Sequence, residues 1–116
     1  MARTMYTGRM FDAIALGATP ATATSAAVRM DASEAMSIQS QVVTTAGTIN
    51  VTYTYQVSSN SDGPWVDGNT SIAAHTPALD ITGFSPEAAK WIRMIVTNND
   101  ATAITELTSV LTIQEG

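Results

Sequence analysis

The 116-residue sequence contains no cysteine and a single histidine, His75. Without cysteine, the chain can form neither a disulfide framework nor a thiolate metal site. A zinc site would need His75 together with acidic residues from elsewhere in the chain. The same histidine could serve as the base for a serine nucleophile, but no Gly-x-Ser-x-Gly motif accompanies it. We therefore expect no catalytic residue and no cofactor, and we interpret His75 as an ordinary loop residue.

Charged residues are also scarce, at 13% of the chain, where soluble proteins typically have about 25%. The net charge of −5 argues against nucleic acid as a partner of the folded domain. The apolar stretch Phe11 to Leu16 is far too short to span a membrane, and Asp12 interrupts it. The sequence thus predicts no nucleic-acid partner and no membrane partner. Its weakly charged surface, rich in Thr, Ser, Ala and Asn, suits close packing against protein subunits.

What the sequence does contain is the alternation of apolar and polar residues that is typical of β-strands. Residues 48–57, TINVTYTYQV, alternate strictly, and residues 90–100 and 104–114 also carry strand patterns. Residues 35–45 form a further candidate strand, and the turn at residues 46–47 would join it to residues 48–57 as an antiparallel hairpin. Several short strands separated by turns predict an all-β fold, an antiparallel β-sandwich or jelly roll.

The length of the chain fits one domain, which we place at residues 12–116. Residues 1–11 are predicted to form an extended N-terminal arm. This segment contains two arginines and no acidic residue, so we expect it to dock onto an acidic neighbour. The residues available to such a partner are Arg3, Met5, Tyr6, Arg9, Met10 and Phe11.

The segment VSSNSDGPWVDGNT, residues 57–70, places Trp65 between two Asp-Gly pairs. Its possible oxygen ligands for Ca²⁺ are Asn60, Asp62, Asp67 and Asn69. Their spacing fits no EF-hand loop, and Asp-Gly pairs form turns for backbone reasons alone. These four residues are therefore candidates for calcium and not a predicted site. Trp65 could cover the open end of the sandwich core, or it could stack against a sugar with Trp91 as a second aromatic.

Three stretches resemble a family of small virion proteins of tailed bacteriophages. The family pattern is a strand ending in qvS.S.DG.Wv, a middle segment with an aromatic residue followed by vR, and a closing strand. The matching stretches are YQVSSNSDGPWVDG (Tyr55 to Gly68), ALDITGFSPEAAKWIRMIVTNND (Ala78 to Asp100) and TSVLTIQ (Thr108 to Gln114). The resemblance covers about the C-terminal two thirds of the chain. Carbohydrate-binding and discoidin-like sandwiches share the turn tryptophan and the aromatic-x-Arg feature.

The resemblance implies a non-enzymatic virion structural protein, a capsid decoration (cement) protein. Such a protein would be made in the host cytoplasm and would lie on the capsid surface. It would bind the major capsid protein, or another virion protein, as a homo-oligomer and most often as a trimer, with the arm extended on the shell or on a sister subunit.

The resemblance further implies that Trp65 and Trp91 are structural aromatics at the end of the core. Arg93 would bond loop carbonyls or an acid such as Asp62 or Asp67. Two alternatives remain open for the chain as a whole: a carbohydrate- or host-surface-binding module, and a tail or filament subunit.

Overall fold

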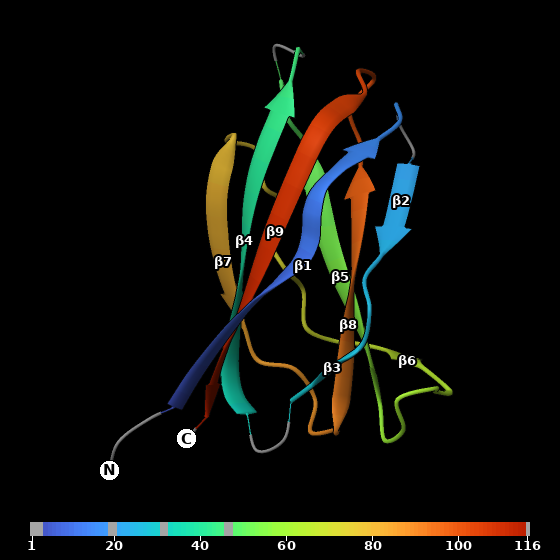
Figure 1. The fold of residues 1–116 in the computed structure, drawn as a ribbon, viewed down its shortest axis with the longest axis vertical. Helices are drawn as coiled ribbons and strands as arrows, with labels where there is room; N and C mark the ends of the chain where they lie inside the picture. Colours follow the sequence, from blue (N-terminus) through green and yellow to red (C-terminus); the bar gives the residue numbers. More distant parts are fainter. Residues whose placement is uncertain (1–3, 19–20, 31–32, 46–47, 116) are drawn as a thin grey trace.

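The structure, a computed structural model, describes residues 4–18, 21–30, 33–45 and 48–115. It is an all-β fold in which two antiparallel sheets pack face to face (Figure 1). The predicted antiparallel β-sandwich is therefore confirmed. The described residues contain no helix, and hence none that is long and apolar enough to cross a membrane.

Sheet A has the strand order β1-β9-β4-β7. Its strands are β1 (Thr4–Leu16), β9 (Ile104–Glu115), β4 (Ser33–Thr44) and β7 (Leu79–Phe84). β1 begins where β9 ends, because Thr4 pairs with Glu115, so the two ends of the described chain lie side by side (Figure 1). Among the described residues, β7 pairs only with β4 and forms one border of the sheet.

Sheet B has the strand order β2-β8-β5-β6, and β3 pairs with β8 beyond the end of β2. Its strands are β2 (Ala21–Thr24), β3 (Val28–Arg29), β5 (Val51–Ser58), β6 (Val66–Asp67) and β8 (Trp91–Asn98). β8 therefore lies inside the sheet, as expected for a strand with apolar residues on both faces.

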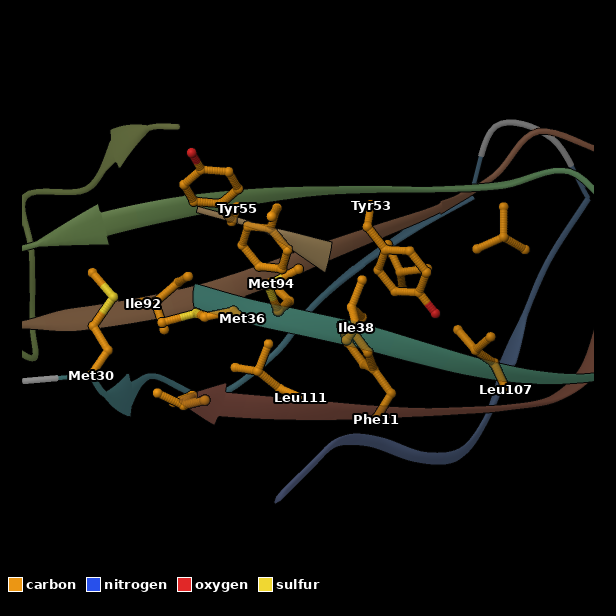
Figure 2. Close-up of a cluster of buried hydrophobic side chains, with 14 of the residues drawn as sticks. Phe11, Met30, Met36, Ile38, Tyr53, Tyr55, Ile92, Met94, Leu107 and Leu111 are labelled. Atoms are coloured by element: carbon orange, nitrogen blue, oxygen red, sulfur yellow. The ribbon is translucent and has the colours of Figure 1, made fainter. Parts of the chain in front are cut away.

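Buried and more exposed residues alternate along the strands, and the buried ones face the core between the two sheets. In β8, Ile92, Met94 and Val96 are fully buried, whereas the residues between them are only half-buried. Figure 2 shows Tyr53 of β5 directed towards Ile38, which β4 contributes from the other sheet, and both belong to the same core cluster. Each large apolar side chain that is removed from water in this way contributes about 1.5–3 kcal/mol.

The predicted hairpin between residues 35–45 and 48–57 does not form. β4 pairs with β7 and β9 in sheet A, whereas β5 pairs with β6 and β8 in sheet B. Both strands carry one apolar face, and a two-sheet core buries these faces against each other across the sandwich. The chain therefore passes from sheet A to sheet B between Thr44 and Val51, and the turn predicted at residues 46–47 lies outside the described residues.

Residues 4–11 belong to the sheet and are not an arm apart from the domain. They form the first half of β1, in which Thr4 to Arg9 pair with β9 from Glu115 to Val110. This half of β1 covers an edge of the long strand β9 that would otherwise be unpaired. Arg3 and the side chains of Met5 and Tyr6 lie outside what the structure describes.

Candidate functional site

The described residues of the predicted partner surface are engaged within the chain. Phe11 is only 5% exposed and belongs to the core, and Met10 packs against that core. Arg9 is exposed, but its Nη1 donates to Asp12 Oδ1 at 2.8 Å. An exposed pair of this kind contributes about 0–1 kcal/mol. Phe11, which pairs with Ser109, therefore stabilises the sandwich core, and Met10 packs against that core from the register shift between Arg9 and Phe11. Their role as partner contacts stays a prediction.

Trp65 lies in the loop between β5 and β6, with its ring against Arg93. The Arg93 guanidinium carbon is 4.5 Å from the ring centroid, a cation–π contact that contributes about 0.5–1 kcal/mol when it is exposed. Arg93 Nε and Nη2 also donate to Gln56 Oε1 at 2.8 and 2.6 Å. Gln56 Nε2 in turn donates to Asp67 Oδ1 at 2.8 Å. Arg93 thus bonds the Gln56 amide, and Gln56 stands between it and the predicted acid Asp67.

Trp91 lies on the outer face of sheet B, where β8 begins. The strand register places Arg29 of β3 on one side of it and Ser58 of β5 on the other. The Arg29 guanidinium carbon is 5.9 Å from the Trp91 ring centroid. Because Ile92 points into the core, alternation directs Trp91 outward. Trp65 and Trp91 are both half-buried outside the core cluster, which corrects their predicted place at the end of the core.

Two grooves flank the loop of residues 59–63. The first, which we call the Glu87 groove, has a volume of about 490 Å³ and includes Val57, Pro64, Val66 and Glu87 in its lining. The second has a volume of about 500 Å³. We call it the Trp91 groove, and it is lined by residues 59–63, Arg29, Lys90 and Trp91. The walls of the second groove are predominantly polar and those of the first are predominantly apolar.

The four calcium candidates are divided between these grooves. Asp62 lines the Trp91 groove, Asp67 and Asn69 line the Glu87 groove, and Asn60 borders both. The Asp67 carboxylate already accepts the hydrogen bond from Gln56. Within the ranges that the structure describes, no group of three or more His, Asp or Glu residues is placed to hold a metal ion.

Glu87 fastens the segment that follows β6 to Tyr55 of sheet B. Its carboxylate accepts hydrogen bonds from the Tyr55 hydroxyl and from the Asn69 backbone N–H, the latter at 2.9 Å. These bonds, that of Tyr55 foremost, lower the pKa of Glu87, and burial together with Glu87 raises the pKa of Tyr55. The Tyr55 hydroxyl also accepts from the Thr70 backbone N–H at 3.0 Å. The loop wall of the Glu87 groove is thereby fixed to a core aromatic residue.

His75 is fully buried between the sheets, which corrects its interpretation as an ordinary loop residue. Its backbone exchanges hydrogen bonds of 2.8 and 3.0 Å with Val51. Its Nδ1 lies 2.6 Å from Ser40 Oγ and its Nε2 lies 2.9 Å from Thr82 Oγ1. Its ring meets Tyr53 edge-on, at 5.0 Å between centroids. Burial lowers the pKa of His75, against a weaker opposing effect of Asp80.

The contact between Ser40 and His75 is of the kind that activates a serine nucleophile. Both residues are 0% exposed, so a substrate cannot reach the Ser40 hydroxyl in this structure. Close by, Tyr53 Oη lies 2.6 Å from Ser109 Oγ, another fully buried hydroxyl. Every buried side-chain nitrogen or oxygen of the described residues has a hydrogen-bond partner. The cluster therefore joins the two sheets, since a satisfied polar network specifies how they pack.

Exposed aliphatic residues gather on the outer face of sheet A beside β7. Val43, Leu79 and Ile81 are 49%, 61% and 59% exposed, and we call them the β7 patch. Leu79 pairs with Gln41 and Ile81 with Gln39, so Val43 lies on the same face of the neighbouring strand. Val43 lies in the strand predicted for residues 35–45, whereas an alternating pattern does not indicate which strand forms the border of a sheet.

The fold also occurs in solved structures of other proteins. PBSX exported protein XepA matches with a TM-score of 0.62 and 14% identity over 96% of this chain. SPBc2 prophage-derived protein YomS matches with a TM-score of 0.59 and 7% identity over 99% of this chain and 96% of its own. The infectious bursal disease virus VP2 subviral particle matches with a TM-score of 0.57 and 12% identity over 97% of this chain.

This chain spans only 37% of the XepA chain and 33% of the VP2 chain. No protein-family model matches the chain, and no curated protein matches it in sequence. At such low identities the likeness establishes the architecture alone: the chain has a β-sandwich fold that is similar to those of XepA, YomS and VP2.

Proposed function

We propose that this chain is a non-enzymatic structural subunit of a bacteriophage particle. In this role it is a capsid decoration protein that binds the major capsid protein as a homo-oligomer on the head surface. Two observations of different kinds support the proposal. The fold is similar to those of a prophage-derived protein and of a virus-particle protein, and the grouped exposed aliphatic residues lie at the border of a weakly charged sheet.

The observation that carries the proposal is the β7 patch, at a sheet border where β7 pairs only with β4 among the described residues. Natural proteins protect such borders with lysine, proline, bulges or a covering segment. β7 reads LDITGF, keeps an unbroken register with β4, and has only Asp80 as a charged residue, which is half-buried. Leu79 and Ile81 project from the outer face of this border, where no described strand pairs with the second edge of β7. This border therefore offers both hydrogen bonds and apolar area to another strand.

The occupant that we assign to the β7 patch is a second copy of this chain. Pairing of two identical β7 strands closes a dimer, whereas contact of β7 with a different edge of the next copy closes a ring. The trimer that the resemblance implies needs the second arrangement. Next to the patch, β4 presents Gln39 and Gln41, and β9 presents Thr108 and Thr112. Few charges would have to be desolvated if this face met a capsid shell.

Native mass spectrometry of the wild-type protein and of a Leu79→Lys/Ile81→Lys variant tests the oligomer. The wild type is expected as a closed oligomer and the variant as a monomer, since two lysines place charge in the contact. Val66→Lys is the matched control, because Val66 is 63% exposed but lies in sheet B. A monomeric wild type, or a variant that assembles like the control, would contradict the proposed contact. Open polymers of increasing length would favour the filament subunit.

Co-sedimentation with expanded, genome-free heads of the phage that encodes the chain tests the location. The wild type and Val66→Lys are expected to pellet with the heads, and the Leu79→Lys/Ile81→Lys variant is expected to bind less, because fewer contacts act together in a monomer. Failure of an oligomeric wild type to pellet would refute decoration of the head while leaving self-association intact.

A further inference from the structure

The Trp91 groove combines an aromatic ring, two cations and a polar loop, and the proposed structural role uses none of them. It lies at the end of sheet B where β3 runs beside the start of β8 and the loop after β5 begins (Figure 1). One wall is formed by Arg29, Lys90 and Trp91, and the other by residues 59–63. Its volume of about 500 Å³ lies within the usual range of about 300–1,000 Å³ for small-ligand sites.

The charge of the groove is opposite to that of the molecule. The chain has a net charge of −5 and only five lysines and arginines, yet two of these, Arg29 and Lys90, line this one groove. Asp62 is the single acidic residue among the described residues that line it, and Arg29 also has an interaction within the chain. Arg29 is held over the Trp91 ring, and Lys90 is exposed at the mouth of the groove. The groove therefore favours an anion in a molecule that otherwise repels anions.

The remaining groups fit a hydroxyl-rich ligand. Ser59, Asn60 and Ser61 offer hydroxyl and amide groups that both donate and accept, and Asp62 accepts two hydrogen bonds. Trp91 is half-buried, so part of its ring is available for stacking against an apolar surface. A sugar ring has such a surface on one face and hydroxyls around its rim. A nucleic acid does not fit, because two cations neutralise too few phosphates.

We infer that the Trp91 groove binds an anionic saccharide, a pyranose that carries a carboxylate. The sugar ring stacks on Trp91, its carboxylate pairs with Lys90 and Arg29, and its hydroxyls bond the loop from Ser59 to Asp62. The site lies in sheet B and the β7 patch lies in sheet A, so the inference does not depend on the proposed assembly. A particle subunit with such a site would contact acidic polysaccharide at a cell surface.

The two tryptophans of the chain allow a direct test by NMR. A short oligosaccharide of galacturonic acid is titrated into the ¹⁵N-labelled protein, and the two indole N–H signals are followed after assignment with Trp91→Phe. The Trp91 signal is expected to shift and that of Trp65, which stacks on Arg93, to stay. The fully methyl-esterified oligosaccharide, which keeps the ring and loses the charge, is expected to bind at least about tenfold more weakly.

Lys90→Gln should weaken binding of the galacturonate at least about tenfold, and its spectrum reports whether the fold is kept. Arg9→Gln is the matched control, since it also removes one exposed cation but lies in sheet A. The inference is overturned if the Trp91 signal does not move, if the ester binds as well as the acid, or if Arg9→Gln weakens binding as much as Lys90→Gln. A glycerol phosphate polymer that binds as tightly as the galacturonate would also overturn it, because that polymer has no sugar ring to stack.

Discussion

Mild acid should destabilise this fold through His75. The ring is fully buried, and its two nitrogens contact the hydroxyls of Ser40 and Thr82. Tyr53 packs against the ring, and Asp80 is the nearby charge. Burial disfavours the charged imidazolium more than Asp80 favours it, so the pKa of His75 is lowered in the folded state.

The size of the effect follows from proton linkage. In the unfolded chain His75 titrates near its ordinary value of about 6.5. Below that pH, His75 is protonated in the unfolded state but stays neutral in the folded state. The free energy of unfolding therefore falls by up to about 1.4 kcal/mol for each unit by which the pH decreases. The fall ends when the pH reaches the lowered pKa of folded His75. The chain has no second histidine, and the hydrogen bonds that lower the pKa of Glu87 affect stability only at more acidic pH.

Urea unfolding at several values between about pH 7 and about pH 5 measures this slope. His75→Gln is the comparison, because it removes the titrating group and keeps an amide that can bond the neighbouring hydroxyls. The wild type should lose stability as the pH falls, and the variant should stay nearly flat. Equal slopes in both proteins, or a wild type that gains stability towards pH 5, would refute the assignment of the effect to His75.

Two further substitutions test the packing. Phe11→Ala should cost about 3–5 kcal/mol in urea unfolding, since Phe11 is 5% exposed; a loss below about 0.5 kcal/mol would mean that this segment is separate from the core after all. Gly68→Ala should lower the free energy of unfolding by about 1–3 kcal/mol, because its Cβ would collide with the Tyr55 ring. Gly8→Ala, whose Cβ meets nothing within 4 Å, should change it little, and equal losses at both glycines would contradict the close contact.

The sequence predicts the strands better than their partners. Strict alternation in residues 48–57 identifies β5 and the face that it buries, because a one-sided core imposes a period of two. Residues 90–100 identify β8 as a strand, but it has apolar residues on both faces, so its pattern does not select the face that it buries. The choice of partner depends on contacts between distant segments, and the strand next along the chain from β4 lies in the opposite sheet. In β1 the apolar residues come as the adjacent pairs Met5-Tyr6 and Met10-Phe11. The register shift between Arg9 and Phe11 interrupts the expected period there.

The candidate site was only partly predictable, because it too depends on contacts between segments that are distant in the sequence. Alternation from Ile92 suffices to place Trp91 outside the core, but nothing local brings Arg29 beside it. The burial of His75 depends on Ser40 and Thr82, which two other strands supply. The Trp91 groove likewise brings residues 59–63 beside Arg29, Lys90 and Trp91. The alternation of apolar and polar residues does not predict this contact between distant segments.

The pairing of Thr4 with Glu115 means that the polypeptide enters and leaves the sandwich at a single point (Figure 1). Domains with adjacent ends tolerate insertion into other proteins, because the host backbone need not stretch to accommodate them. This sandwich could therefore be spliced whole into an exposed loop of a larger polypeptide. Two tags fused to its ends would emerge as close neighbours, which makes the pair of ends a natural place for a split reporter or a distance label.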